Sequence, residues 1–117
     1  MEIQYKTNKL STLCHNLNKA KKIYNENVAQ KLLETINFIE AAPTLKDIVN
    51  YPPFHFHDLK GTKKGLFAID LGRKLGYRLI VKPLNPDNSE CTNEQVFGKD
   101  AIKIIIMFVE EVSNHYE

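Results

Sequence analysis

Two segments in the middle of the chain alternate apolar and polar side chains with the period of two that is typical of β-strands. In residues 66–71, the apolar side chains that share one face are Phe67, Ile69 and Leu71. In residues 77–82, one face carries Tyr77, Leu79 and Val81, and the other carries Arg78, Ile80 and Lys82. The segment between them begins and ends with glycine, which adopts positive φ freely. The pattern predicts an antiparallel hairpin with a loop longer than a two-residue turn.

The first third of the chain shows the helical spacing of three and four instead. A first helix is expected from a cap at Asn8 or Ser11, with apolar positions continuing through Ala20 to Ile23. A second helix is expected to start at residues 25–27 and to carry Val28, Leu32, Ile36 and Ile39 on one stripe. It should end at residues 42–43, because the residue before a proline leaves the α region. These two helices are predicted to cover one face of the sheet.

The remaining segments complete the predicted element order. Residues 2–5 alternate and are expected to form a short strand at a sheet edge. Thr44 is predicted to cap a single helical turn, and residues 54–57 to run extended after two prolines. Residues 83–94 are rich in turn-forming residues, and we expect a long loop there without chemistry. Residues 101–112 fit a buried helix by periodicity alone, but their β-branched density favours a central strand.

The elements together predict one α+β domain over residues 1–117, with a small, mainly antiparallel twisted sheet and two N-terminal helices on one face. No apolar run has the length of a membrane span, and the N-terminus lacks the apolar region of a signal peptide. Cys14 and Cys91 lie far apart without metal-ligand spacing. We therefore expect two free thiols, a cytoplasmic location, no metal site and no cofactor.

Charge is concentrated in the hairpin and the segment before it. Residues 57–82 hold seven basic and two acidic side chains, a net charge of +5, whereas the whole chain carries +2. Lysines at hairpin tips also protect sheet edges from pairing, and this explanation fits Lys63, Lys64 and Lys74. It fits Arg78 less well, because an arginine on a central strand must reach water, a carboxylate or an anion. A clustered basic face favours phosphate, and hence nucleic acid.

The same region resembles a known family. The motifs are His57-x-Leu59-Lys60-Gly61, then the strand start Lys64-Gly65-Leu66-Phe67, then the strand Tyr77-Arg78-Leu79-Ile80. In this order and spacing they are similar to the RelE/ParE superfamily of bacterial toxins, nearest to its HigB-like branch, the plasmid maintenance killer proteins. The resemblance covers most of the chain. His57 matches the family's histidine, whereas His55 has no match and is expected to be a surface histidine.

The resemblance implies the toxin of a type II toxin–antitoxin system, a ribosome-dependent endoribonuclease that cuts mRNA by metal-independent attack of a 2′-hydroxyl. Such chemistry needs cations for the phosphoryl oxygens and groups that move protons, a role for which histidine is suited near neutral pH. The catalytic candidates are His57, Arg78, His115 and Tyr116. The RNA-binding candidates are Lys60, Lys63, Lys64, Arg73, Lys74 and Lys82.

Two departures from the family accompany these candidates. HigB-like toxins end in aspartate-tyrosine-histidine, whereas this chain has Asn114-His115-Tyr116, so the roles of the two rings stay open. RelE has two lysines where this chain has Ala68 and Asp70. The implied partners are the ribosome with its mRNA and a cognate HigA-like antitoxin with a helix-turn-helix part, without a membrane. The alternatives are a ParE-like inhibitor of DNA gyrase and an inactive member that only binds an antitoxin.

Overall fold

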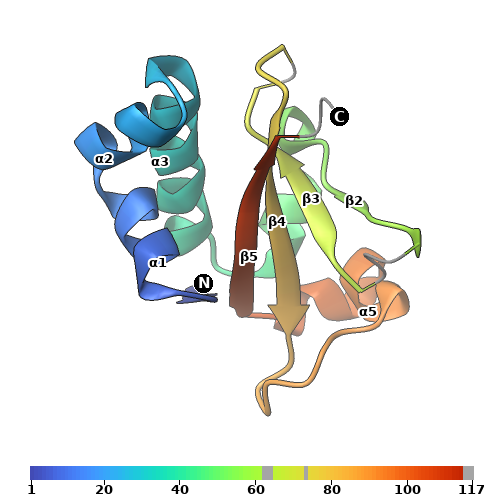
Figure 1. The fold of residues 1–117 in the computed structure, drawn as a ribbon. Helices are drawn as coiled ribbons and strands as arrows, with labels where there is room; N and C mark the ends of the chain where they lie inside the picture. Colours follow the sequence, from blue (N-terminus) through green and yellow to red (C-terminus); the bar gives the residue numbers. More distant parts are fainter. Residues whose placement is uncertain (62–64, 73, 115–117) are drawn as a thin grey trace.

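The computed structural model describes residues 1–61, 65–72 and 74–114, and it contains a mixed sheet of five strands together with helices (Figure 1). The strands are β1 (Glu2–Tyr5), β2 (His57–Asp58), β3 (Phe67–Asp70), β4 (Tyr77–Leu84) and β5 (Ile106–Asn114). The α-helices are α1 (Asn8–His15), α2 (Leu17–Ile23), α3 (Glu26–Ala41), α4 (Leu45–Val49) and α5 (Asn93–Phe97). Two short 3₁₀ helices are η1 (Pro52–Phe54) and η3 (Lys99–Lys103). The α+β class predicted from the sequence is confirmed.

The sheet has the strand order β1-β5-β4-β3-β2. The edge strand β1 pairs in parallel with β5, and the other three pairs are antiparallel, so the sheet is mainly antiparallel as predicted. The predicted hairpin is β3–β4, and Gly72 and Gly76 at the two ends of its turn have φ of 93° and 76°. Residues that have a Cβ rarely adopt such positive φ angles, whereas glycine adopts them freely. This explains the glycines at both ends of the turn. The last strand, β5, lies inside the sheet, as its β-branched residues indicate.

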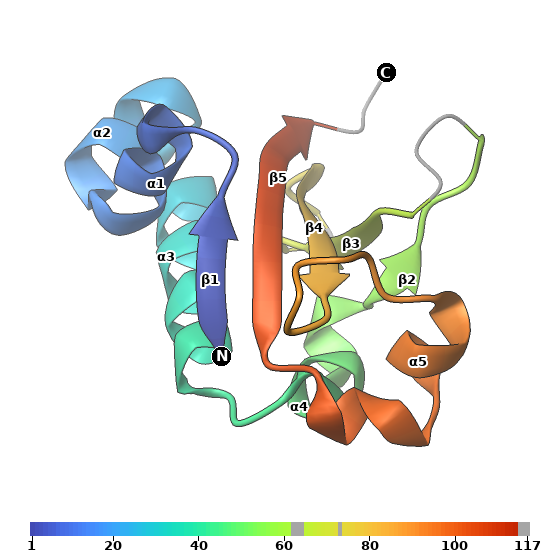
Figure 2. The same ribbon diagram turned by 90° about the horizontal axis from the view of Figure 1, so that it is seen from below.

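The helices pack on one face of the sheet and build a single core with it. Buried side chains of α1, α3, α4 and α5 join Phe67, Ile69, Leu79, Val81 and Met107 in one cluster. The apolar faces predicted for β3 and β4 therefore point to the helices. In Figure 2, β1 runs between α3 and β5, and α5 lies near β2, at the other end of the sheet from α1 and α2. Both cysteines are free and buried, and burial raises the pKa of the Cys14 thiol to about 12.

The prediction of one continuous helix in the first part of the chain is wrong, because the chain forms two helices there, α1 and α2. Thr7 caps α1 by accepting a hydrogen bond from the Leu10 amide at 3.1 Å, rather than Asn8 or Ser11. Asn16 then leaves the helical region, with φ of −126°, and its side chain accepts from the Lys19 amide to cap α2. An asparagine offers the backbone such a local alternative to a continuous helix. The chain therefore has three N-terminal helices instead of two, and α2 packs on α1 and α3.

The predictions for α3 and for the turn at Thr44 are confirmed. Asn25 caps α3, and the Thr44 side chain accepts a hydrogen bond from the Lys46 amide at the start of α4. The extended segment predicted for residues 54–57 is wrong at its start, because the two prolines enter η1 and His55 then adopts φ of 44°. This turn sets the direction from which β2 approaches the sheet.

Two further expectations need correction in the second half of the chain. The segment expected as a loop is shorter than residues 83–94, because β4 extends to Leu84 and α5 starts at Asn93 with a reciprocal capping box between Thr92 and Gln95. The last strand begins at Ile106 rather than near residue 101, because residues 99–103 form η3. Ile102 and Ile105 are about half exposed, so the apolar run is only partly a core segment. The strand also extends to Asn114, beyond the predicted end.

Candidate nucleic-acid interface

The face of the sheet opposite the helices is formed by side chains at alternate positions of the strands. Cross-strand partners share a face of an antiparallel sheet. The pairing registers therefore put His57, Ala68, Ile80 and Glu111 in one row across four strands, and Asp70, Arg78 and Ser113 in the next row. Lys82 and Phe108 form a third pair on the same face. We call the surface made by these nine residues the open face, because the described helices pack on the other face.

Arg78 lies near the centre of the open face, where β4 is paired on both sides. Its side chain is partly exposed, but its Nε atom is buried and has no hydrogen-bond partner among the described residues. Asp70 is its cross-strand neighbour on β3, yet no ion pair joins the two side chains. An unpaired guanidinium N–H costs free energy unless a partner reaches it. Arg78 thus has one guanidinium N–H that no described residue satisfies, near the centre of the open face.

His57 lies on β2, at the far end of the row that contains Ala68 and Ile80. Its Nδ1 lies 2.7 Å from the backbone carbonyl oxygen of His55. A carbonyl only accepts, so Nδ1 carries the proton and donates it. In the neutral ring, Nε2 then keeps its lone pair and is able to accept a proton. The His55 and His57 rings also contact each other, with their centroids 4.9 Å apart.

The separation of these two groups follows from sheet geometry. His57 and Arg78 lie two strands apart and two residues apart along the strand direction. With strand spacings of about 4.8 Å and a rise of about 3.4 Å per residue, their Cα atoms are about 12 Å apart. Both side chains extend from the same face. Ala68 and Ile80 lie between the two groups in the registers and are fully buried.

The lysines predicted to bind RNA fall in different environments. The Lys82 ammonium lies 3.3 Å from a Glu90 carboxylate oxygen and 5.4 Å from the centroid of the Phe108 ring. Glu90 thus offsets part of its charge. Lys60 is exposed beside a hollow that is also lined by Asp58, Gly65 and Asn93. Lys74 is exposed in the turn between β3 and β4. Lys82 thus lies on the open face, whereas Lys60 and Lys74 lie in the segments at the ends of β2 and β3.

Five candidate residues lie outside the described part of the chain: Lys63, Lys64, Arg73, His115 and Tyr116. Their neighbours along the chain indicate only where these segments join the fold. Gly61 and Gly65 flank the first two lysines, next to the end of β2. Asn114 ends β5 opposite Tyr77, at the end of the sheet where Gly72 and the hairpin turn lie.

The open face also contains two carboxylates, of which only Asp70 is named in the sequence analysis. Asp70 is the cross-strand partner of Arg78, and Glu111 ends the row that begins with His57. A register shift between Ile80 and Val81 puts both Glu110 and Glu111 opposite this part of β4, and no local sequence pattern indicates such a bulge. Among the described residues, no three histidine, cysteine or acidic side chains are arranged to hold a metal ion.

Comparison of the chain with protein-family models, with curated protein sequences and with solved structures gives no match. The open face is therefore interpreted from its own residues. In the described part of the chain, no helix has the length and apolar character needed to cross a membrane.

Proposed function

We propose that this chain is the toxin of a type II toxin–antitoxin pair of the RelE/ParE superfamily, HigB-like branch, and that it cuts mRNA on the ribosome. The observation that carries the proposal is the presence of Arg78 and His57 on one helix-free face of the sheet. One is a cation with a buried N–H that no described residue satisfies, and the other is an imidazole whose Nδ1 is held by a hydrogen bond. These are two of the parts that metal-independent RNA cleavage requires.

The proposed reaction assigns a step to each group. His57 Nε2 removes the proton of a ribose 2′-hydroxyl, and the resulting oxyanion attacks the adjacent phosphorus. Arg78 donates to the phosphoryl oxygens, on which negative charge increases in the transition state. The 5′-oxygen of the next nucleotide leaves and takes a proton from an acid, a role that we assign to His115 or Tyr116. The products are a 2′,3′-cyclic phosphate and a 5′-hydroxyl.

The proposed partners follow from the same surface. The RNA backbone is attracted by Lys82 on the open face, by the exposed Lys60 and Lys74, and by Lys63, Lys64 and Arg73 in the adjoining segments. A HigA-like antitoxin with a helix-turn-helix part would bind the chain and prevent access of mRNA. The proposal also implies a cytoplasmic protein, since ribosomes and mRNA are found there.

Expression of the chain without an antitoxin is expected to arrest growth and to produce mRNA ends inside translated regions. The physical reason is that the ribosome delivers single-stranded mRNA, whose 2′-hydroxyls are free to approach the open face. The measurement is transcriptome-wide mapping of 5′-hydroxyl ends before and after induction. A variant with His57 replaced by asparagine serves as the matched control and should give no new ends.

Growth arrest with intact transcripts would contradict the proposed nuclease. Accumulation of cleaved DNA–gyrase complexes in the same cells would then favour the ParE-like alternative, in which the chain inhibits gyrase by binding. Normal growth at a high level of soluble chain would favour an inactive member that only binds an antitoxin.

A further inference from the structure

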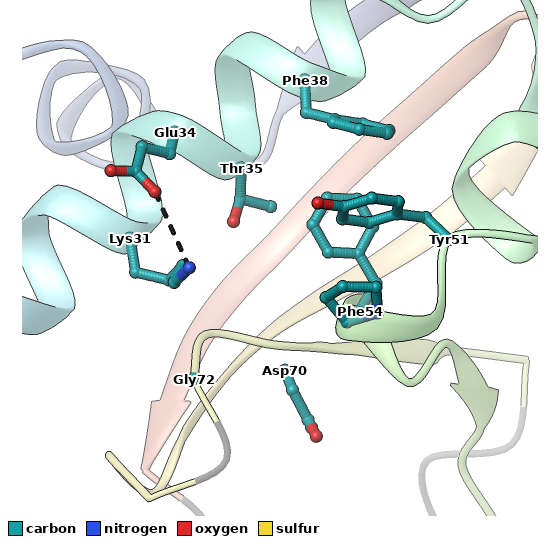
Figure 3. Close-up of a pocket in the computed structure, with 9 residues that line it drawn as sticks. Lys31, Glu34, Thr35, Phe38, Tyr51, Phe54, Asp70 and Gly72 are labelled. Atoms are coloured by element: carbon teal, nitrogen blue, oxygen red, sulfur yellow. Dashed lines mark ion pairs between the residues drawn. The ribbon is translucent and has the colours of Figure 1, made fainter.

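A groove of about 480 Å³ lies on the helix side of the sheet, between α3 and the segment that contains Tyr51 and η1 (Figure 3). Its two walls differ in chemistry. One wall comes from α3 and carries Lys31, Glu34 and Thr35, whereas the other wall is aromatic and carries Tyr51 and Phe54. Asp70 and Gly72 also line the groove, so it reaches the edge of the open face at Asp70, but no other residue of the open face lines it. Its volume is within the range of small-molecule sites.

Thr35 gives the groove an unsatisfied polar group. The residue is only 1% exposed, and its Oγ1 has no hydrogen-bond partner among the described residues. Threonine in a helix commonly donates to the carbonyl four residues earlier, but here the hydroxyl does not. Figure 3 shows the hydroxyl directed into the space between Lys31 and the aromatic wall. Since a buried hydroxyl without a partner is costly, a ligand that supplies a polar atom at this depth would be favoured.

The aromatic wall is held by contacts among its own rings. The Tyr51 ring centroid lies 4.5 Å from that of Phe38 and 4.8 Å from that of Phe54. Tyr51 is 38% exposed, so a substantial part of this large side chain remains uncovered. A preformed aromatic surface of this kind suits a flat ring, because stacking costs little reorganisation.

The polar wall carries an ion pair, and Asp70 adds a second carboxylate to the lining of the groove. The Lys31 ammonium lies 3.7 Å from a Glu34 carboxylate oxygen, and both side chains are about half exposed or more. The pair offers a donor and an acceptor side by side without net charge. A carboxylate is the group that binds ribose hydroxyls in nucleotide sites, whereas it repels a phosphate.

From these features we infer that the groove binds a neutral nucleoside. Its base lies against Tyr51 and Phe54, a polar edge of the base pairs with the Thr35 hydroxyl, and its ribose hydroxyls donate to Glu34. An apolar ligand would leave Thr35 unpaired, and a nucleotide would bring its phosphate to Glu34. This inference is independent of RNA cleavage, since it uses neither His57 nor Arg78, and of the open face only Asp70 lines the groove.

The test is a titration of the ¹⁵N-labelled chain with adenosine, followed by heteronuclear NMR and by equilibrium dialysis. We expect saturable binding with shifts at the amides of α3 and of residues 51–54. Thr35→Val removes only the hydroxyl and should weaken adenosine binding roughly tenfold. Its melting temperature without adenosine should not fall, because the hydroxyl that it removes is unpaired. Glu34→Gln, at an exposed position, should also weaken binding, and adenosine 5′-monophosphate should bind less tightly than adenosine.

Thr12→Val is the matched control, because the Thr12 hydroxyl already donates to the Asn8 carbonyl on the exposed surface of α1. It should bind adenosine like the unmodified chain. Absence of saturable binding at millimolar adenosine would overturn the inference. Equal affinity of Thr35→Val and the unmodified chain for adenosine would also overturn it. Tighter binding of adenosine 5′-monophosphate than of adenosine would overturn it as well, because it would locate the binding site among the basic residues.

Discussion

Replacement of Arg78 by alanine should reduce single-turnover cleavage of ribosome-bound mRNA by about 10²–10³-fold, the usual effect of removing one donor to a developing oxyanion. The chain should stay folded. Leu79 and Val81 on the core side of β4 are unchanged, and the substitution removes a buried N–H that has no partner among the described residues. Circular dichroism and thermal melting should therefore match those of the unmodified chain. Toxicity in cells should disappear.

Two control variants show whether cleavage needs the Arg78 side chain at this position or only a positive charge. Lys103→Ala removes the same charge from a side chain that is 78% exposed and pairs with Asp100, so it should cleave nearly normally. Arg78→Lys keeps the charge but lacks the planar fork of donors, and should give an intermediate rate. If Arg78→Ala is unfolded, the residue is structural and its assignment to the reaction is wrong.

Replacement of His57 by asparagine should reduce the rate of cleavage by about 10²–10⁴-fold, the range for a positioned proton-transfer group. Asparagine retains an N–H close to the position of Nδ1, so the hydrogen bond to the His55 carbonyl oxygen should survive. It lacks a basic nitrogen in place of Nε2. The rate of single-turnover cleavage should fall, whereas the affinity for the ribosome should change little.

His55→Asn is the matched control for this experiment. The backbone of His55 has φ of 44°, a conformation that asparagine adopts readily, and the carbonyl that binds His57 is retained. It should cleave close to the rate of the unmodified chain. Equal losses in both variants would indicate that the segment is needed for folding of β2, and would contradict a role for His57 in proton transfer.

The hairpin β3–β4 could be predicted because alternation, two glycines and the β-branched residues all indicate the same structure. Arg78 was assigned to the correct face by the same alternation, which is a local property. The break at Asn16 was missed because the apolar spacing continues across it, whereas the cap that interrupts the helix depends on one side chain. The capping box at Thr92 was present in the sequence, but it starts a helix of only five residues.

The rest of the candidate site depends on contacts between distant segments. His57 shares a face with Arg78 only through the registers of three strands, and β2 contains just two residues. Glu90 partly neutralises the charge of Lys82. This contact depends on the path of the segment after β4, which the periodic patterns of helices and strands do not predict. Thr35 is an unremarkable residue in the sequence of α3. Its importance arises from the groove that Tyr51 and Phe54 complete.

Cleavage of mRNA by the purified chain on programmed ribosomes tests the central claim most directly. The measurement compares end-labelled mRNA bound in the ribosome with the same mRNA free in solution, under single-turnover conditions and with chelator present. The account predicts cuts within the ribosome-bound coding sequence that leave a 2′,3′-cyclic phosphate, and loss of these cuts in Arg78→Ala and His57→Asn. Ribosome-bound mRNA that stays intact with a folded, unmodified chain would contradict it.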